Sequence, residues 1–322
     1  MRLKGYHALV CAIQAGLAVF ILSCSGSDSG QPAREKGSET ASTIVDDVGR
    51  RVSLGPPARR IVSLAPNATE ILFSIGAGER IIGITEQCNF PPEASSIPKI
   101  GGFSFLNIER LIGLKPDLVI LTSLEQDRFV KNLEELGLRA YVSFPRDFDQ
   151  LFRSIESIGR LTGDSDGAKA LVASLEADLA ALREEVDRHY GEAARPRVYL
   201  EISSRPLMTI GDDSFVDALI EEAGGKNIAL DIPRDYAVIS SEVVIDRDPD
   251  VIFVCRSSTT REDVGRRLGW GRIRAVETDQ VYDDLDEDMI MRPGPRSVQG
   301  AREIFERLRK AEERDDAVGG TG

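Results

Sequence analysis

A short segment occurs twice in this chain, and this internal repeat constrains the fold more than any other feature. Residues 107–117 (Asn-Ile-Glu-Arg-Leu-Ile-Gly-Leu-Lys-Pro-Asp) align without gaps on residues 240–250 (Ser-Ser-Glu-Val-Val-Ile-Asp-Arg-Asp-Pro-Asp). Each copy predicts a capped helix, a proline turn that ends the helix, and an apolar strand. A chance similarity between two ordinary helix-to-strand turns is the alternative. If the repeat is real, the chain forms two similar lobes.

Short apolar runs alternate with amphipathic stretches on both sides of the chain's middle. We expect strands at residues 60–64, 81–84, 117–121, 140–144, 198–202, 251–254 and 280–282. We expect helices at residues 68–75, 107–114, 124–136, 215–223, 241–245 and 295–309. Between the two sets, residues 166–190 carry leucines at helical spacing and predict one long helix. The expected fold is α/β, with two Rossmann-like lobes joined by a single long helix and a ligand cleft between the lobes.

The N-terminus resembles a bacterial lipoprotein export signal. Arg2 and Lys4 precede a mainly apolar run at residues 8–22, which is short for a membrane-spanning helix. Ile-Leu-Ser-Cys at residues 21–24 resembles a lipobox, which predicts cleavage before Cys24 and lipidation of its thiol. A plain signal peptide or an uncleaved anchor is the alternative interpretation.

These patterns divide the chain into segments. We expect a lipoprotein signal peptide at 1–23, a flexible tether at 24–42, an N-terminal α/β lobe at 43–163, a connecting helix at 164–192, a C-terminal α/β lobe at 193–310, and a disordered tail at 311–322. The tether is rich in Ser, Gly, Asp and Glu and lacks the apolar residues that a folded core needs.

The net charge and the scarcity of cysteine and histidine exclude several classes of function. The formal net charge of −13 disfavours nucleic acid as a partner. After the predicted cleavage and lipidation, Cys88, Cys255 and His189 are the cysteines and histidine that remain free. They are too few for a bare transition-metal site or for a Ser-His-Asp or Cys-His catalytic group. We therefore predict no enzyme activity, no catalytic residue, no resident metal and no cofactor, so that a metal cargo would arrive already chelated.

Several segments together resemble a known family over about residues 43–308. They are residues 60–70 (Arg-Ile-Val-Ser-Leu-Ala-Pro-Asn-Ala-Thr-Glu), 89–94 (Asn-Phe-Pro-Pro-Glu-Ala), 107–111, 115–120 (Lys-Pro-Asp-Leu-Val-Ile) and 223–227 (Ala-Gly-Gly-Lys-Asn). The chain resembles the helical-backbone substrate-binding proteins of ABC importers for cobalamin, ferric siderophores and haem. Residues 88–92 and 292–296 look most like the cobalamin-binding branch.

The resemblance implies a ligand site between the lobes. Its expected ligand-facing residues are Gln87, Phe90, Phe103, Phe105, Tyr236, Asp288, Met291 and Arg292. Two positions depart from the cobalamin-binding branch, which has a tryptophan where this chain has Phe103 and an aromatic residue where it has Thr122. The cleft is therefore less aromatic than in that branch, which leaves room for a different chelate.

The resemblance also implies a partner. Family members present one glutamate per lobe to arginine pockets of the transporter, and Glu70 and Glu221 are assigned to those positions. The expected partners are an ABC importer permease dimer with its ATPase and a small-molecule chelate. The expected location is the periplasmic or cell-surface side of a membrane, where a monomer is held by its lipid anchor alone.

The leading function is thus capture of cobalamin or a related corrinoid and its delivery to the permease. A ferric siderophore or haem is the alternative cargo within the family. A signalling lipoprotein that binds only a protein partner is the alternative from another class. An enzyme on the same two-lobed scaffold is disfavoured because the chain lacks a cysteine cluster.

Overall fold

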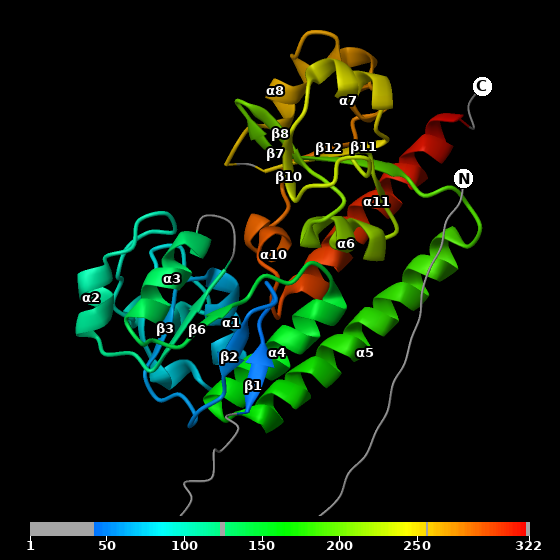
Figure 1. Cartoon of the computed structure of the whole chain (residues 1–322). Coiled ribbons are helices and arrows are strands. Elements are labelled where there is room, and N and C mark those ends of the chain that lie inside the picture. The colour runs from blue at the N-terminus through cyan, green and yellow to red at the C-terminus, as the bar shows by residue number, and fades with distance from the viewer. Residues whose placement is uncertain (1–41, 123–125, 256, 320–322) are drawn as a thin grey trace, which may run out of the picture. The chain divides into compact units, whose positions relative to one another are not determined.

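A computed structural model describes residues 42–122, 126–255 and 257–319, except for the side chains of residues 127 and 312–319 (Figure 1). The predicted signal peptide, Cys24 and nearly all of the predicted tether lie outside the described residues. Residues 41–322 belong to one compact unit. Among the described helices, none is both long and apolar enough to cross a membrane.

The N-terminal lobe is built on a parallel sheet of order β4-β3-β5-β6. Its strands are β3 (Ile61–Ser63), β4 (Ile81–Ile84), β5 (Leu118–Leu121) and β6 (Ala140–Val142). Its helices are α1 (Pro66–Ser74), α2 (Ile108–Gly113) and α3 (Asp127–Glu135), and a separate antiparallel hairpin joins β1 (Thr43–Val45) to β2 (Arg51–Ser53). Strands β3, β5 and β6 are buried along their whole length, as expected for a parallel sheet that is covered on both faces.

The C-terminal lobe repeats this arrangement and adds a hairpin. Its strands are β7 (Arg197–Ser204), β8 (Leu207–Ile210), β9 (Lys226–Asn227), β10 (Tyr236–Val238), β11 (Val251–Val254) and β12 (Val281–Tyr282). Its helices are α6 (Phe215–Glu222), α7 (Ser241–Arg247), α8 (Arg261–Gly265), α9 (Arg274–Glu277), α10 (Glu287–Met291) and α11 (Ser297–Gly319). The parallel strands follow the order β9-β7-β11-β12, which matches the N-terminal sheet, whereas β8 and β10 pair antiparallel and were not predicted.

Two helices link the lobes. The expected long connecting helix is α5 (Ser165–Tyr190), whose Leu175, Leu179 and Leu182 are buried. A second helix, α4 (Phe148–Thr162), precedes α5 and packs along it, as Figure 1 shows, and was not predicted from the sequence. Helix α11 also packs on α5. The disordered tail expected from residue 311 is wrong as far as residue 319, because α11 continues to that point.

Matching backbone conformations show that the two copies of the internal repeat fold in the same way. Lys115 and Asp248, which occupy the same place in the two copies, both have a positive φ, of 49° and 45°. The aspartate that follows each proline then bonds the start of a central strand, because Asp117 accepts the Arg60 N–H at 3.1 Å and Asp250 accepts the Arg197 N–H at 2.8 Å. The prediction of two similar lobes is confirmed.

Candidate functional site

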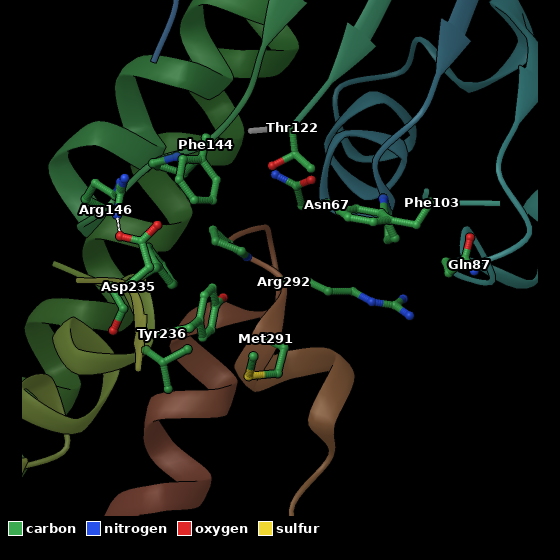
Figure 2. A pocket seen from close by; sticks show the side chains of 16 residues that line it. Asn67, Gln87, Phe103, Thr122, Phe144, Arg146, Asp235, Tyr236, Met291 and Arg292 are labelled. Carbon is green, nitrogen blue, oxygen red and sulfur yellow. Dashed lines mark ion pairs between the residues drawn. The ribbon is translucent and has the colours of Figure 1, made fainter. Parts of the chain in front are cut away.

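A cavity of about 230 Å³ lies between the two lobes, and Figure 2 shows the side chains that line it. All four strands of the N-terminal sheet contribute through the residues that follow their carboxyl ends, namely Asn67, Gln87, Thr122 and Phe144. The opposite wall comes from residues 214–216 at the start of α6, from residues 235–236 at the start of β10, and from residues 291–293 at the end of α10. A site beyond the carboxyl ends of parallel strands is the usual ligand position in α/β folds.

The structure brings five of the eight predicted ligand-facing residues to this cavity. They are Gln87, Phe103, Tyr236, Met291 and Arg292. The other three do not line it. Phe90 lies under the guanidinium of Arg296, Phe105 is 81% exposed, and Asp288 forms an ion pair with Arg292.

Two of the aromatic cavity residues, Phe103 and Tyr236, occupy equivalent places just before the two copies of the repeat. Phe103 stands four residues before the helix cap Asn107, and Tyr236 stands four residues before the helix cap Ser240. Tyr236 is carried by β10, which pairs with β8. Phe103 is carried by a tight turn that needs glycine, since Gly101 has a φ of +137° and a Cβ there would lie 2.3 Å from the Phe105 carbonyl oxygen. The repeat therefore places one aromatic ring from each lobe in the same cavity (Figure 2).

A buried amide ties the N-terminal loops of the site together. The Gln126 side chain, whose residue is 1% exposed, donates to the carbonyl oxygens of Leu64 at 2.9 Å and Phe103 at 3.4 Å. Its own oxygen accepts the Thr122 N–H at 3.0 Å. The position of Phe103 is thus coupled to the ends of β3 and β5. Gln126 was not predicted from the sequence, because no local pattern marks a glutamine whose side chain forms hydrogen bonds to distant loops.

Arg146 and Asp235 form an ion pair between the lobes at the cavity wall, drawn as a dashed line in Figure 2. The Arg146 guanidinium also lies 3.5 Å from the Asp213 carboxylate and 4.4 Å from the centre of the Phe144 ring. Arg146 and Asp235 were not predicted from the sequence either. Its available signal was the position of residues 144–146 directly after a buried strand, where loops of α/β sheets carry ligand contacts.

Arg292 is neutralised by acidic and amide partners. Its guanidinium lies 2.6 Å from Asp288 and 3.6 Å from Glu70, and it donates to the Asn89 side-chain oxygen at 2.6 Å. Both cationic side chains of the cavity wall, Arg146 and Arg292, therefore have carboxylate partners. Burial raises the pKa of the Tyr236 hydroxyl, an effect that Arg146 partly opposes, so this hydroxyl stays protonated and is available as a hydrogen-bond donor.

The prediction that Glu70 docks on a transporter is wrong for the structure described. Glu70 is 3% exposed, and its two carboxylate oxygens accept hydrogen bonds from Arg296 at 2.8 and 2.7 Å. A carboxylate held in this way inside the molecule has no free surface to offer a partner. Glu221 is exposed on α6, and its docking role stays a prediction.

Comparisons with known proteins agree with the fold. The sequence profile of the family described as "Periplasmic binding protein" matches residues 61–287. The uncharacterized ABC transporter substrate-binding lipoprotein YvrC of Bacillus subtilis is 31% identical over 304 residues, which cover 90% of this chain and 93% of that protein.

Solved structures of similar proteins show the same fold. The periplasmic vitamin B12 binding protein BtuF of Vibrio cholerae superposes with a TM-score of 0.70 at 27% identity, covering 80% of this chain and 98% of that one. The periplasmic heme-binding protein RhuT of Roseiflexus sp. RS-1, in its apo form, superposes with a TM-score of 0.71 at 26% identity, covering 79% of this chain and 99% of that one. Proteins with the same fold are thus named as binding two different ligands, vitamin B12 and heme.

Proposed function

This chain belongs to the periplasmic binding protein family, and on that premise we propose that it is the extracytoplasmic substrate-binding protein of an ABC importer. Its cargo is cobalamin or a related corrinoid, which it captures in the interlobe cavity and delivers to a permease dimer with its ATPase. It works as a binding protein, without catalysis and without a cofactor of its own.

The observation that carries the choice of cargo is the charge balance of the aromatic cavity. Phe103, Phe144 and Tyr236 present ring surface to it, while Arg146 and Arg292 are each paired with carboxylates. An apolar wall without uncompensated charge suits a flat ligand that has neutral amide edges. Gln87 and the protonated Tyr236 hydroxyl supply hydrogen-bond groups for such edges.

The size of the cavity limits how a bulky ligand can bind. A volume of about 230 Å³ lies below the range of roughly 300–1,000 Å³ that is usual for small-molecule sites. A bulky macrocycle would therefore either insert only one edge or enter after the lobes separate. The Arg146–Asp235 ion pair joins the lobes at this point and would have to yield in the second case.

A ferric siderophore or haem is the second candidate cargo, because the similar RhuT protein is named as heme-binding. The acidic groups of such chelates call for unpaired arginines, whereas the two cavity arginines are already neutralised. The charge balance therefore favours the corrinoid. A signalling lipoprotein that binds only a protein partner is the remaining candidate, and it predicts that the cavity binds none of these chelates.

The location follows from the same proposal. The similar YvrC protein is named as a lipoprotein, which supports export, cleavage before Cys24 and a lipid anchor for this chain. We propose that the chain acts as a monomer on the outer side of the membrane that holds its permease. Labelling with a radioactive fatty acid would test the anchor, and Cys24→Ser should abolish the label.

The deciding experiment is calorimetric titration of residues 41–322, which form one compact unit, with cyanocobalamin. Haemin and a ferric hydroxamate are titrated in parallel. Saturable one-to-one binding of cyanocobalamin at micromolar affinity or tighter, about −8 kcal/mol, supports the proposal. Binding of haemin or the hydroxamate alone keeps the family and overturns the cargo. If none of the three chelates binds, the transport function is overturned and a signalling lipoprotein that binds only a protein partner is favoured.

A further inference from the structure

Asn67 is a buried amide at the wall of the interlobe cavity. It lies in the first turn of α1, and the residue is only 5% exposed. It lines the same cavity as Phe103 and Thr122 (Figure 2). Its side-chain nitrogen donates to the Ser143 hydroxyl at 3.3 Å. Within residues 42–122, 126–255 and 257–319, no hydrogen bond is formed by its side-chain oxygen, so this acceptor is left for a molecule in the cavity.

A chain of buried hydroxyl groups continues from this amide to the N-terminal hairpin. The hydroxyl oxygens of Ser143 and Ser154 are 3.1 Å apart. The Ser154 oxygen lies 3.4 Å from the Tyr141 hydroxyl, and this hydroxyl also lies 3.4 Å from a carboxylate oxygen of Asp47. Ser143, Ser154 and Tyr141 are each 0% exposed, so the chain is shielded from bulk water.

The carboxylate of Asp47 determines which groups of the chain donate. Burial raises its pKa to about 6, although hydrogen bonds from the Phe144 N–H and from Ser154 oppose this shift, so at neutral pH the carboxylate is ionised and can only accept. Ser154 therefore donates to the carboxylate, and Ser143 donates to Ser154. The Ser143 hydroxyl has no second hydrogen, so it can only accept from Asn67. This fixes the amide with its nitrogen toward Ser143 and leaves its oxygen to face the cavity.

We infer that Asn67 is a ligand-binding residue whose side-chain oxygen accepts a hydrogen bond from an amide N–H on the edge of the cargo and selects against a carboxylate edge. The inference rests on the proposed function and deepens it, because it names the residue and the ligand group that set specificity. An amide edge has a hydrogen to donate, whereas an ionised carboxylate has none and would bring two acceptors together. A buried group that is left unpaired costs affinity, so such a site discriminates between the two edges.

The test is calorimetric titration of residues 41–322, which form one compact unit, with cyanocobalamin and with its monocarboxylic acids, in which one side-chain amide is hydrolysed to a carboxylate. The main variant is Asn67→Leu, which keeps the size of the side chain and removes both polar atoms. The matched control is Asn132→Leu, at an exposed position of α3. We expect about tenfold weaker binding of cyanocobalamin by Asn67→Leu and wild-type binding by Asn132→Leu.

The preference between the ligands is the second measurement. At least one monocarboxylic acid should bind the wild type about tenfold more weakly than cyanocobalamin, and Asn67→Leu should reduce that preference to about threefold or less. Ser143→Ala is an independent variant, because it keeps the amide and removes the group that fixes its direction. It should lower the same preference with a smaller loss of affinity for cyanocobalamin. A purely structural role of Ser143 would lower the melting temperature and leave the preference unchanged.

Each contrary result has a distinct meaning. If the wild type binds cyanocobalamin and Asn67→Leu binds it equally well, the inference fails while the proposed function stands. If Asn67→Leu weakens cyanocobalamin and every monocarboxylic acid by the same factor, or if the wild type does not distinguish them, Asn67 only shapes the cavity and the inference is overturned. A wild type that binds haemin or a ferric hydroxamate but not cyanocobalamin overturns the proposed cargo and this inference together. A wild type that binds no chelate overturns the transport function as well.

Discussion

The carboxylate of Glu70, on α1 of the N-terminal lobe, accepts two hydrogen bonds from the guanidinium of Arg296, which directly precedes α11. Both side chains are largely buried, at 3% and 16% exposure, and Arg296 also covers the Phe90 ring at 4.1 Å. The pair raises the pKa of the Arg296 guanidinium, with the hydrogen bond to Glu70 as the main cause. This contact joins the two lobes beside the cavity. The Arg292 guanidinium lies next to it, between Glu70 of the N-terminal lobe and Asp288 of the C-terminal lobe.

Glu70→Gln should therefore destabilise the protein. Loss of one partner leaves a buried guanidinium without full compensation, which costs about 3 kcal/mol in comparable pairs. Chemical denaturation of residues 41–322 measures the change, and Glu221→Gln, at an exposed glutamate of α6, is the control expected to stay within about 0.5 kcal/mol. Equal stability of the two variants would contradict a structural role for Glu70.

Phe103→Ala and Tyr236→Ala should each weaken binding of the transported chelate about tenfold. Both rings line the cavity, and truncation removes aromatic contact area on one face of the ligand. Calorimetry gives the dissociation constants. Phe105→Ala makes the same change two residues away on an exposed side chain and should leave the constant unaltered. Equal effects of Phe103→Ala and Phe105→Ala would show that the cavity assignment is wrong.

Asp235→Asn should change which chelates bind. The substitution removes the carboxylate that neutralises Arg146 and leaves the more distant Asp213, at 3.5 Å, as its acidic partner. An anionic chelate would then gain about tenfold in affinity, while a neutral corrinoid would change less than twofold. Asp231→Asn is the matched control, because Asp231 pairs with Arg247 outside the cavity. A gain for the neutral ligand instead would contradict the charge argument.

Asp47 should make stability depend on pH in the mildly acidic range. Burial raises its pKa from an ordinary value of 3.8 to about 6, although its carboxylate accepts the Phe144 N–H at 2.7 Å. The folded state thus binds the proton more tightly than the unfolded state. The stabilisation is full below pH 3.8 and is lost as the pH rises through about 6.

Unfolding free energies measured from pH 4 to pH 7 should fall by about 2 kcal/mol on account of Asp47 in the wild type. Asp47→Asn should flatten this part of the profile, and Asp149→Asn, at an exposed position of α4, should not. A profile that keeps its slope in Asp47→Asn would assign the dependence to another group. Because Phe144 lines the cavity, the same pH series with ligand present would show whether this hydrogen bond also affects binding.

Local patterns in the sequence were enough to predict the family, the two lobes and most strands. Apolar runs, caps and proline turns act within a few residues, so the repeated segments at 107–117 and 240–250 predicted equivalent elements, which the structure confirms. The resemblance to the family, and not local pattern, predicted Gln87, Phe103 and Tyr236 as ligand-facing, and all three line the cavity.

Tertiary packing decided the roles that local patterns could not. The resemblance to the family assigned Glu70 to a docking surface, yet residues 67–72 of α1 are all buried, so α1 has no solvent face at that position. Its partner Arg296 lies 226 positions away in the sequence. Phe105 was assigned to the cavity because it is aromatic and next to Phe103, yet a tight turn directs it outward. Composition and spacing indicate which environment a side chain favours. Only the packing of distant segments determines whether a carboxylate pairs with a buried cation and whether an aromatic ring is exposed to solvent.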